Sequence, residues 1–160
     1  MIVLLLTFVV VLLDQWTKYL IRIKMELFES IPVIDGFFHL TYVTNDGMAF
    51  GINFPGGFYI FTAASLIMTG VLVYYLWIEK EGSIILRLAL AFILGGAVGN
   101  LIDRVFLRSV VDFLDFIFGS YHFYIFNIAD SSVTVGMILF LFYSFIIHPK
   151  ENPQPNLIEE

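Results

Sequence analysis

The chain has no cysteine and carries little charge. Of its 160 residues, 14% are Asp, Glu, Lys or Arg. Without cysteine it can form no disulfide, no thiol nucleophile and no cysteine-ligated zinc site. Its histidines stand far apart, at positions 39, 122 and 148, and no HExxH motif occurs. We therefore expect no metal and no other cofactor.

The charge also lacks the pattern of a nucleic-acid-binding protein. The formal net charge is -6 at pH 7, and no basic stripe runs along any segment. Proteins that bind nucleic acids usually carry clustered lysines and arginines. We therefore expect no nucleic-acid partner.

Apolar residues dominate the chain. They make up 59% of the sequence, and the mean hydropathy is +0.90. A soluble domain of this length would carry more polar surface, so the composition predicts an integral membrane protein with one domain. Four segments approach the roughly 20 residues that a membrane-spanning helix needs. These predicted helices cover about residues 1–23, 58–78, 84–106 and 124–147.

The first helix is expected to stay in the mature chain. It lacks a basic start and an A-x-A cleavage site, and its apolar part continues past Asp14. The predicted fold class is therefore membrane all-α, a four-helix transmembrane bundle within residues 1–147. The Pro- and Asn-rich segment 148–160 is expected to be a flexible tail.

A small β element is expected between the first two helices, at about residues 30–52. Apolar and polar side chains alternate over 38–43, which is the period of a strand, and Asn45-Asp46-Gly47 is typical of a turn. This strand would offer an edge to an extended peptide. The loop EKEGS, residues 79–83, would lie on the opposite membrane face. Charge alone does not decide which face is inside.

Several polar residues interrupt the apolar segments. Ionisable groups there cost a few kcal/mol, so each is a candidate for function. Asn100 and Arg104 share one helix face, and so do Asn127 and Asp130. Alternating chain direction brings seven polar residues to one membrane face: Asp14, Asn45, Asn100, Arg104, Asp112, Asn127 and Asp130.

Each of these residues also has a structural interpretation. Asp14 and Lys18 are spaced as an interfacial ion pair. Asp103 could pair with a basic neighbour and fix helix packing, and the GxxxG spacing within 95–99 is typical of close helix contact. Asp130 could simply cap a helix. The many aromatic residues, 18% of the chain, fit lipid-facing surface and interfacial belts.

Five sequence blocks carry a family resemblance that covers about residues 8–147. They are DQWTK at 14–18, NDGMAFG at 45–51, GNLIDR at 99–104, VVDF at 110–113 and FNIADSS at 126–132. Each block alone is weak, but five in this order and spacing are highly specific. The chain closely resembles the lipoprotein signal peptidases (signal peptidase II), which are bacterial membrane aspartyl proteases.

The resemblance implies a role for individual residues. Asp112 and Asp130 match the catalytic aspartate pair, and Asp14 matches a residue important for structure. Lys18 and Asp103 are also expected to be structural. Arg108 departs from the family, which often has glycine before VVDF, and this bears on the turn rather than on the chemistry. The positions that match the substrate site are Asn45, Gly47, Phe50, Asn100, Arg104, Asn127 and Ala129.

The resemblance also implies the substrate and the location. The substrate would be a prolipoprotein whose lipobox cysteine carries diacylglycerol, and cleavage would fall just before that cysteine. The expected partners are such lipidated signal peptides and membrane phospholipid, and the enzyme would act as a monomer. It would be a multi-pass protein of the bacterial cell (inner) membrane, with cytoplasmic termini. The β element and the active site would lie on the extracytoplasmic face.

The residues themselves fit this chemistry. Two neighbouring carboxylates share one proton, so one can activate water while the other donates to the scissile carbonyl. Asp115 is expected to be solvated in a loop, outside this pair. The alternatives are a small ion- or proton-coupled transporter, which usually needs internal repeats, and a helical scaffold, which leaves paired aspartates unexplained. GxGD and GxSG protease motifs are absent from the sequence.

Overall fold

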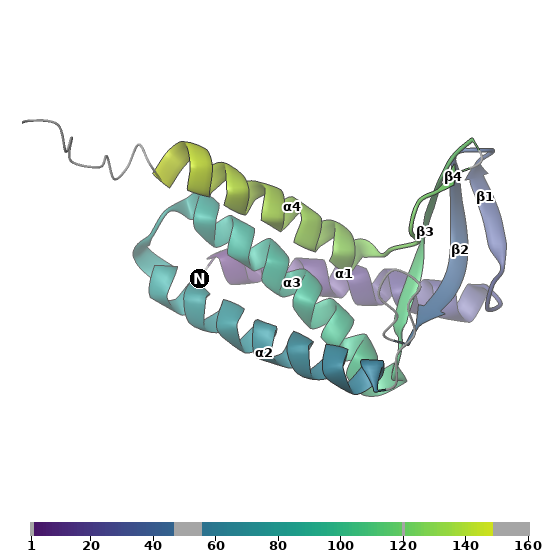
Figure 1. Ribbon diagram of the computed structural model, residues 1–160, viewed down its shortest axis with the longest axis horizontal. Helices are drawn as coiled ribbons and strands as arrows, with labels where there is room; N and C mark the ends of the chain where they lie inside the picture. The colour runs from purple at the N-terminus through teal and green to yellow at the C-terminus, as the bar shows by residue number, and fades with distance from the viewer. Residues whose placement is uncertain (1, 47–55, 120, 149–160) are drawn as a thin grey trace, which may run out of the picture.

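Four long helices lie side by side, and a small sheet stands at one of their ends (Figure 1). The computed structural model describes residues 2–46, 56–119 and 121–148. The helices are α1 (Ile2–Lys24), α2 (Gly57–Ile78), α3 (Ile84–Leu107) and α4 (Ile128–Phe142). A π-helical turn, Tyr143–Ile147, extends α4. Within the described residues, four helices are long and apolar enough to cross a membrane, which confirms the predicted bundle.

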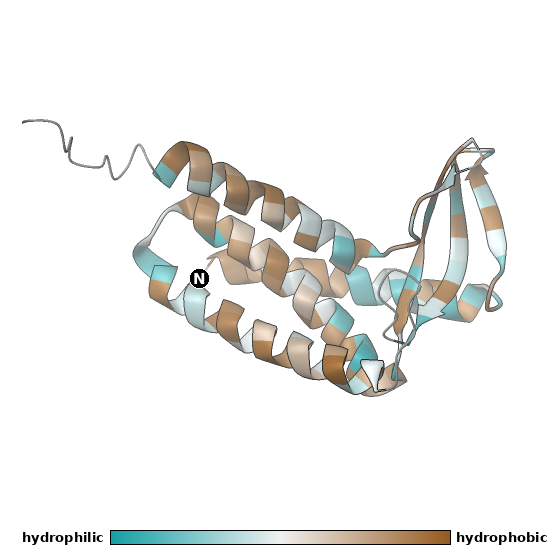
Figure 2. Cartoon of the chain, in the orientation of Figure 1, coloured by the Kyte–Doolittle hydropathy of each residue, from teal (hydrophilic) through white to brown (hydrophobic). Residues whose placement is uncertain are grey.

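α3 is the central helix of the bundle. It packs against α1, α2 and α4, and its side chains Ala89 and Ala91 are fully buried. Most residues of the helices are apolar, as the brown colour in Figure 2 shows, and many of them are exposed. Leu66 and Ile67 of α2, for example, are 62% and 67% exposed. Apolar residues on the outside of a bundle are expected where lipid, not water, is the solvent.

Glycines allow the helices to approach closely. A Cβ atom on Gly96 of α3 would collide with the carbonyl oxygen of Ala129 in α4. A Cβ on Gly136 of α4 would lie 2.8 Å from the carbonyl oxygen of Ala89. The predicted role of the glycines in 95–99 as close helix contacts is therefore confirmed.

The sheet has four antiparallel strands in the order β1-β2-β3-β4. They are β1 (Ser30–Ile34), β2 (Phe38–Asn45), β3 (Val110–Phe118) and β4 (Tyr121–His122). The strand expected at 38–43 is confirmed. However, β2 lies between β1 and β3, so the prediction that it offers a free edge is wrong. The sheet also includes two strands from 110–122, beyond the β element expected at 30–52.

The start of α4 differs from the predicted helix 124–147. Phe126 is extended and pairs with Leu114 of β3, with N to O distances of 2.8 and 3.2 Å. The helix begins only at Ile128, with Asn127 as its N-cap. The backbone groups of Phe126 bond to the sheet and the Asn127 N–H bonds to Asp130, so these residues do not continue the helix toward its N-terminus. Residues 47–52 of the predicted β element lie outside the described residues. So does the predicted tail after His148.

The last turn of α3 ends on Arg108, whose backbone is left-handed with φ of 62°. Its N–H donates to the Arg104 carbonyl oxygen at 3.2 Å. Glycine is the usual residue in this conformation. The turn before β3 is therefore formed in the glycine-like geometry in spite of the arginine side chain.

The two ends of the bundle carry different elements. The turn between α2 and α3, which includes the short helix Glu79–Glu81, lies at the opposite end from the sheet (Figure 1). The N-terminal end of α1 and the C-terminal end of α4 lie at that same end. The loop 79–83 and the β element therefore lie at opposite ends of the bundle, as opposite membrane faces would require.

Candidate active site

Asp130 lies in the first turn of α4 and forms a reciprocal capping pair with Asn127. Asn127 Oδ1 accepts a hydrogen bond from Asp130 N at 3.0 Å, and Asp130 Oδ2 accepts one from Asn127 N at 3.2 Å. This capping box satisfies backbone N–H groups that a helix start leaves free. The positive end of the helix dipole also favours a negative charge there. The carboxylate caps the helix and still keeps its second oxygen for other partners.

Asp112 lies on β3, opposite Val43 of β2, and is 6% exposed. Its Oδ1 accepts a hydrogen bond from Asn127 Nδ2 at 2.6 Å. Asn127 therefore holds both carboxylates, Asp112 through its side-chain amide and Asp130 through its backbone N–H. We call Asp112 and Asp130 the aspartate pair.

Asn100 of α3 joins the aspartate pair from the other side. Its Nδ2 donates to Asp130 Oδ1 at 2.8 Å. Its Oδ1 accepts from Asn127 Nδ2 at 3.1 Å and from Lys18 Nζ at 2.9 Å. Two amides thus connect the carboxylates to each other and to a lysine on α1.

Lys18 lies between two carboxylates at the same end of the bundle. Its Nζ is 2.9 Å from Asp14 Oδ2 and 3.1 Å from Asp103 Oδ2, and each of the three side chains is at most 2% exposed. Buried charges are tolerated only when hydrogen bonds satisfy them. Gln15 Nε2 supplies one, to Asp103 Oδ1 at 2.9 Å. The sequence left open an interfacial ion pair of Asp14 and Lys18. The structure instead has a buried ion cluster of Asp14, Lys18 and Asp103.

An open cavity of about 960 Å³ reaches the aspartate pair. Its wall combines the two carboxylates with the Asn45 side chain at the end of β2. The rest of the wall comes from the extended segment before α4 and from the first turns of that helix. These residues are Phe123, Tyr124, Ile125, Phe126, Ser131, Thr134 and Val135. A mostly apolar wall with two carboxylates suits an apolar substrate and acid–base chemistry.

Comparison with known proteins decides the family. The family model described as signal peptidase (SPase) II, Peptidase_A8, matches residues 6–146. The chain belongs to the signal peptidase II family. The lipoprotein signal peptidase of Bacillus pumilus (strain SAFR-032) is 48% identical over 147 residues, which cover 92% of this chain and 94% of that protein. The lipoprotein signal peptidase of Syntrophus aciditrophicus (strain SB) is 43% identical and covers 89% and 90%.

Solved structures agree with this assignment to signal peptidase II. A structure described as a bacterial membrane enzyme determined by the in meso method has a TM-score of 0.81 and 35% sequence identity. It covers 98% of this chain, and the match spans 94% of that chain. The resemblance read from the five sequence blocks and the predicted fold class are confirmed. The comparisons give no support to a transporter.

Apart from Arg104, the substrate-site residues carried over from the signal peptidase II family fall into three groups. Asn45 lies on the cavity wall, as a substrate-binding role requires. Asn127 and Ala129 are fully buried, and Asn100 is 9% exposed, so their positions favour support of the aspartate pair over direct contact with substrate. Gly47 and Phe50 lie outside the described residues.

Arg104 lies one helical turn beyond Asn100 on α3. Its Nη1 donates to the Asn100 carbonyl oxygen at 3.2 Å. The guanidinium interacts electrostatically with Asp130 first and then with Asp112. It is partly exposed and places a fixed positive charge beside the aspartate pair.

Asp115 does not lie where the sequence suggested. It is part of β3, 4% exposed, and its Oδ2 accepts a hydrogen bond from Thr41 Oγ1 at 2.8 Å. The expectation of a solvated loop carboxylate is therefore wrong. An odd separation along the strand places it on the opposite face from Asp112. It is buried in the sheet and does not line the cavity.

Sequence reasoning also missed the aromatic wall of the cavity and Gln15. The predicted helix 124–147 includes Tyr124, Ile125 and Phe126, and the predicted loop before it ends at Phe123, although all four residues line the cavity. Gln15 lies beside Asp14 in the DQWTK block and bonds to α3 at two points, Asp103 Oδ1 and the Gly99 carbonyl oxygen at 3.1 Å. The signal in the sequence was its position: Gln15 is a polar residue directly after Asp14 in an apolar segment, which indicates a hydrogen bond to a neighbouring helix.

The environment of the aspartate pair favours the protonated form of Asp112. Burial, and after it the charge of Asp130, raises the pKa of Asp112 to about 7. The hydrogen bond from Asn127 acts in the other direction but is weaker. Asp130 accepts hydrogen bonds from Asn100 Nδ2 and from the Asn127 N–H at the start of α4. Among the described residues, no group of three or more His, Asp or Glu side chains could hold a metal ion.

Proposed function

We propose that this chain is the aspartic endopeptidase that removes the signal peptide from prolipoproteins, with Asp112 and Asp130 as its catalytic residues. One observation carries the proposal. Two carboxylates, held together by Asn127 and Asn100, face a single cavity in a member of the signal peptidase II family. Such a pair is the minimum equipment for acid–base hydrolysis of a peptide bond.

Each aspartate has a separate part in the reaction. Asp130, ionised, takes a proton from water as the water oxygen attacks the scissile carbonyl carbon. Asp112, protonated, donates its proton to the carbonyl oxygen and so stabilises the tetrahedral intermediate. When the C–N bond breaks, Asp130 passes its proton to the leaving amine. Asp112 then recovers a proton from the intermediate's hydroxyl, which restores the starting state.

The cavity wall suits a lipidated peptide. The aromatic and aliphatic side chains of 123–126 and Val135 offer apolar surface beside the carboxylates. Acyl chains of a diacylglyceryl cysteine would pack there, each buried CH₂ contributing about 0.8 kcal/mol. Arg104 would hold a substrate carbonyl or a lipid headgroup. The cut would fall just before the lipidated cysteine.

The enzyme would act as a monomer in the bacterial cell membrane, in contact with phospholipid. Its termini would be cytoplasmic, and its active site would face the extracytoplasmic side. The end of the bundle that carries the sheet and the aspartate pair would then meet precursors as they leave the membrane.

Substitution of the aspartates tests the proposal. Asp112→Asn and Asp130→Asn should each lower cleavage of a lipidated precursor peptide by at least about 10³-fold, because Asn can neither ionise nor carry the proton. The double variant should be little worse than either one. Asp115→Asn is the matched control, a buried carboxylate of the same strand outside the cavity. At equal folded amount it should keep turnover within about tenfold. Normal turnover by Asp130→Asn would contradict the assignment.

The lipid requirement has its own test. The same peptide without diacylglycerol should be cut far more slowly in detergent. Equal rates for both peptides would remove the lipoprotein part of the proposal and leave the protease part standing.

A further inference from the structure

Two backbone contacts connect the buried ion cluster to the aspartate pair. Asp14 Oδ1 accepts a hydrogen bond from the N–H of Ala129 at 2.8 Å, and Ala129 directly precedes Asp130. Asp103 Oδ2 accepts one from the N–H of Val111 at 3.0 Å, and Val111 directly precedes Asp112. Each carboxylate of the cluster therefore holds the residue before one member of the pair.

Lys18 contacts both of these carboxylates, Asp14 and Asp103, and also donates a hydrogen bond to Asn100. Its ammonium group has three protons and no acceptor, and three oxygens lie within 3.1 Å, on Asp14, Asp103 and Asn100. Because the lysine can only donate, the oxygen of the Asn100 amide must face it. The NH₂ group of Asn100 must then face Asp130, which is where it donates. A flipped amide would oppose NH₂ to NH₃⁺ and oxygen to carboxylate.

We propose that the buried ion cluster is a clamp in which Lys18 is a positioning residue for the reaction. It fixes the separation of β3 and α4 and the orientation of the Asn100 amide between them. The inference rests on the proposed function. Since small misplacements of catalytic groups cost up to about 10²-fold in rate, the clamp acts on kcat rather than on substrate binding.

Three variants separate this role from simple stabilisation. Lys18→Met keeps the unbranched shape and most of the length of the side chain and removes its charge. Gln15→Met removes a neutral support of the clamp and leaves its charges unchanged. Thr7→Val is the control, because Thr7 Oγ1 makes the same kind of α1-to-α3 bond, to the Ala91 carbonyl oxygen at 3.1 Å, far from the aspartate pair.

The readout is kcat and KM for the lipidated peptide at equal folded amount, together with the melting temperature. Lys18→Met should lower kcat at least about tenfold with KM within about threefold, and Gln15→Met should lower kcat about threefold. Thr7→Val should melt lower with kcat unchanged. If Lys18→Met does not fold, Gln15→Met decides. A kcat for Gln15→Met equal to that of Thr7→Val overturns the clamp. A parent enzyme that cleaves nothing would instead overturn the proposed function.

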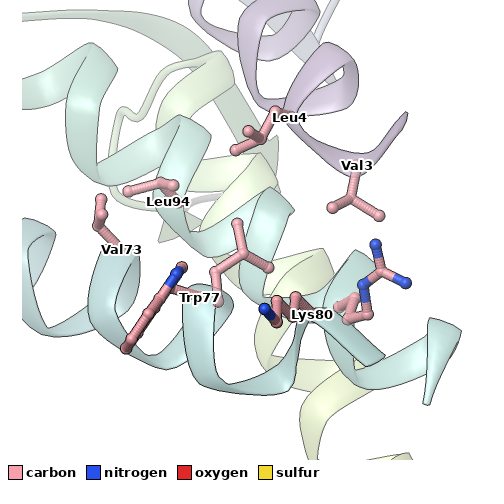
Figure 3. A pocket seen from close by; sticks show the side chains of 8 residues that line it. Val3, Leu4, Val73, Trp77, Lys80 and Leu94 are labelled. Carbon is pink, nitrogen blue, oxygen red and sulfur yellow. The ribbon is translucent and has the colours of Figure 1, made fainter. Parts of the chain in front are cut away.

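A second inference rests on a different part of the molecule, the end of the bundle opposite the sheet. A cavity of about 340 Å³ lies there between α1, α2 and α3. Figure 3 shows Val3 and Leu4 of α1 across from Val73 and Trp77 of α2, with Lys80 at the rim. Its remaining lining residues are Leu76, Arg87 and Leu94.

Both charged residues that line this cavity are positive. Lys80 and Arg87 both line it, whereas the acidic neighbours Glu79 and Glu81 do not. The buried Nε of Arg87 has no hydrogen-bond partner among the described residues. α1 and α2 both pack on α3 and hardly on each other, so the apolar cavity opens between them.

We infer that this cavity binds an anionic phospholipid. The lipid phosphate would lie against Lys80 and Arg87, and an acyl chain would fill the apolar space between α1 and α2. Trp77, 66% exposed, would lie at the headgroup level, where aromatic side chains of membrane proteins gather.

Native mass spectrometry of the purified full chain tests this site. Dioleoylphosphatidylglycerol and dioleoylphosphatidylcholine carry the same chains and differ in headgroup charge. The parent should retain the anionic lipid at least about tenfold better, the scale expected for two cations. Lys80→Gln with Arg87→Gln should abolish this preference, and Arg22→Gln with Lys24→Gln, at the other end of α1, should keep it. Equal retention of both lipids by the parent, or a preference that survives in the Lys80/Arg87 variant, overturns the inference.

Discussion

At the scale of single residues, Asp112 determines how cleavage depends on pH. Its proton is needed for the carbonyl oxygen, and burial followed by the Asp130 charge raises the pKa of Asp112 to about 7. Above that pH the proton is lost, and at low pH the aspartate pair is fully protonated and can no longer activate water. We expect kcat/KM for a lipidated peptide to be bell-shaped, with its alkaline limb near pH 7. Initial rates from about pH 4 to about pH 9 check this. A rate that keeps rising to the upper limit would indicate another base.

Asp112 should also lower the stability of the folded protein at neutral and higher pH. The carboxyl of unfolded Asp112 ionises above its ordinary pKa of 3.8, whereas the folded protein keeps it protonated up to about 7. Folding therefore takes up a proton between these values, and the parent loses stability as pH rises through that window. Asp112→Asn should melt higher, by about 3 °C or more above pH 7, with a smaller difference near pH 4. The exposed Asp35→Asn is the control and should leave the melting temperature unchanged. A lower melting temperature for Asp112→Asn above pH 7 would contradict the burial argument.

Sequence could identify the residue types of the site but not their surroundings. The two aspartates stand in short blocks that match a family, so their proposed role was available without coordinates. The burial of Asp115 was not, because the period of a strand says which residues share a face but not which face is covered. Lys18 was likewise placed beside Asp14 by helical spacing, while its bond to Asn100 joins positions 82 residues apart.

At the scale of elements, Gly96 sets the distance between α3 and α4. An alanine there would push against the Ala129 carbonyl, one residue before Asp130, and against Val133 Cγ2 at 2.6 Å. Gly96→Ala should destabilise the protein by about 1–3 kcal/mol and reduce cleavage. Gly70→Ala in α2, where no atom lies within 4 Å of the new Cβ, should stabilise it by about 0.5–1 kcal/mol. Melting temperature and cleavage rate of both variants, measured in detergent, check this. Equal effects at the two glycines would contradict the close approach.

Element boundaries were predictable where apolar length decides them. α1, α2 and α3 were expected within one or two residues of their observed ends. The start of α4 was placed four residues early, because FYIF is as apolar as the helix that follows it. β3 was missed as a strand because VVDFLDFIF does not alternate cleanly between polar and apolar residues. Its pairing with β2 joins distant segments, which no local pattern reports.

At the scale of the whole molecule, the missing cysteines make the topology directly measurable. A single introduced cysteine will be the only thiol in the chain. Asp35→Cys, in the turn between β1 and β2, should react with a membrane-impermeant maleimide in intact cells. Glu81→Cys, between α2 and α3, should react only after the membrane is permeabilised. The reverse pattern would place the active site on the cytoplasmic side and contradict the proposed orientation.

The number of spans and the family could be predicted from the sequence, but the orientation could not. Length and hydropathy determine how many helices cross a bilayer. Basic residues, which usually report the inner side, lie near both ends of this bundle, at Arg22 and Lys24 as well as at Lys80 and Arg87. Orientation is determined when the chain inserts into a membrane, and the basic residues of this chain do not differ clearly enough between the two ends to indicate it.

The capping role of Asp130 bears on how such genes decay. A copy released from selection for proteolysis would still gain a well-formed start of α4 from Asp130 and Asn127. Asp112 does not stabilise the fold in this way, because burial disfavours its charged form. Drift should therefore remove the aspartate at 112 before the one at 130. In a genome with several paralogues, the residue aligned with position 112 is then the better marker of a working protease.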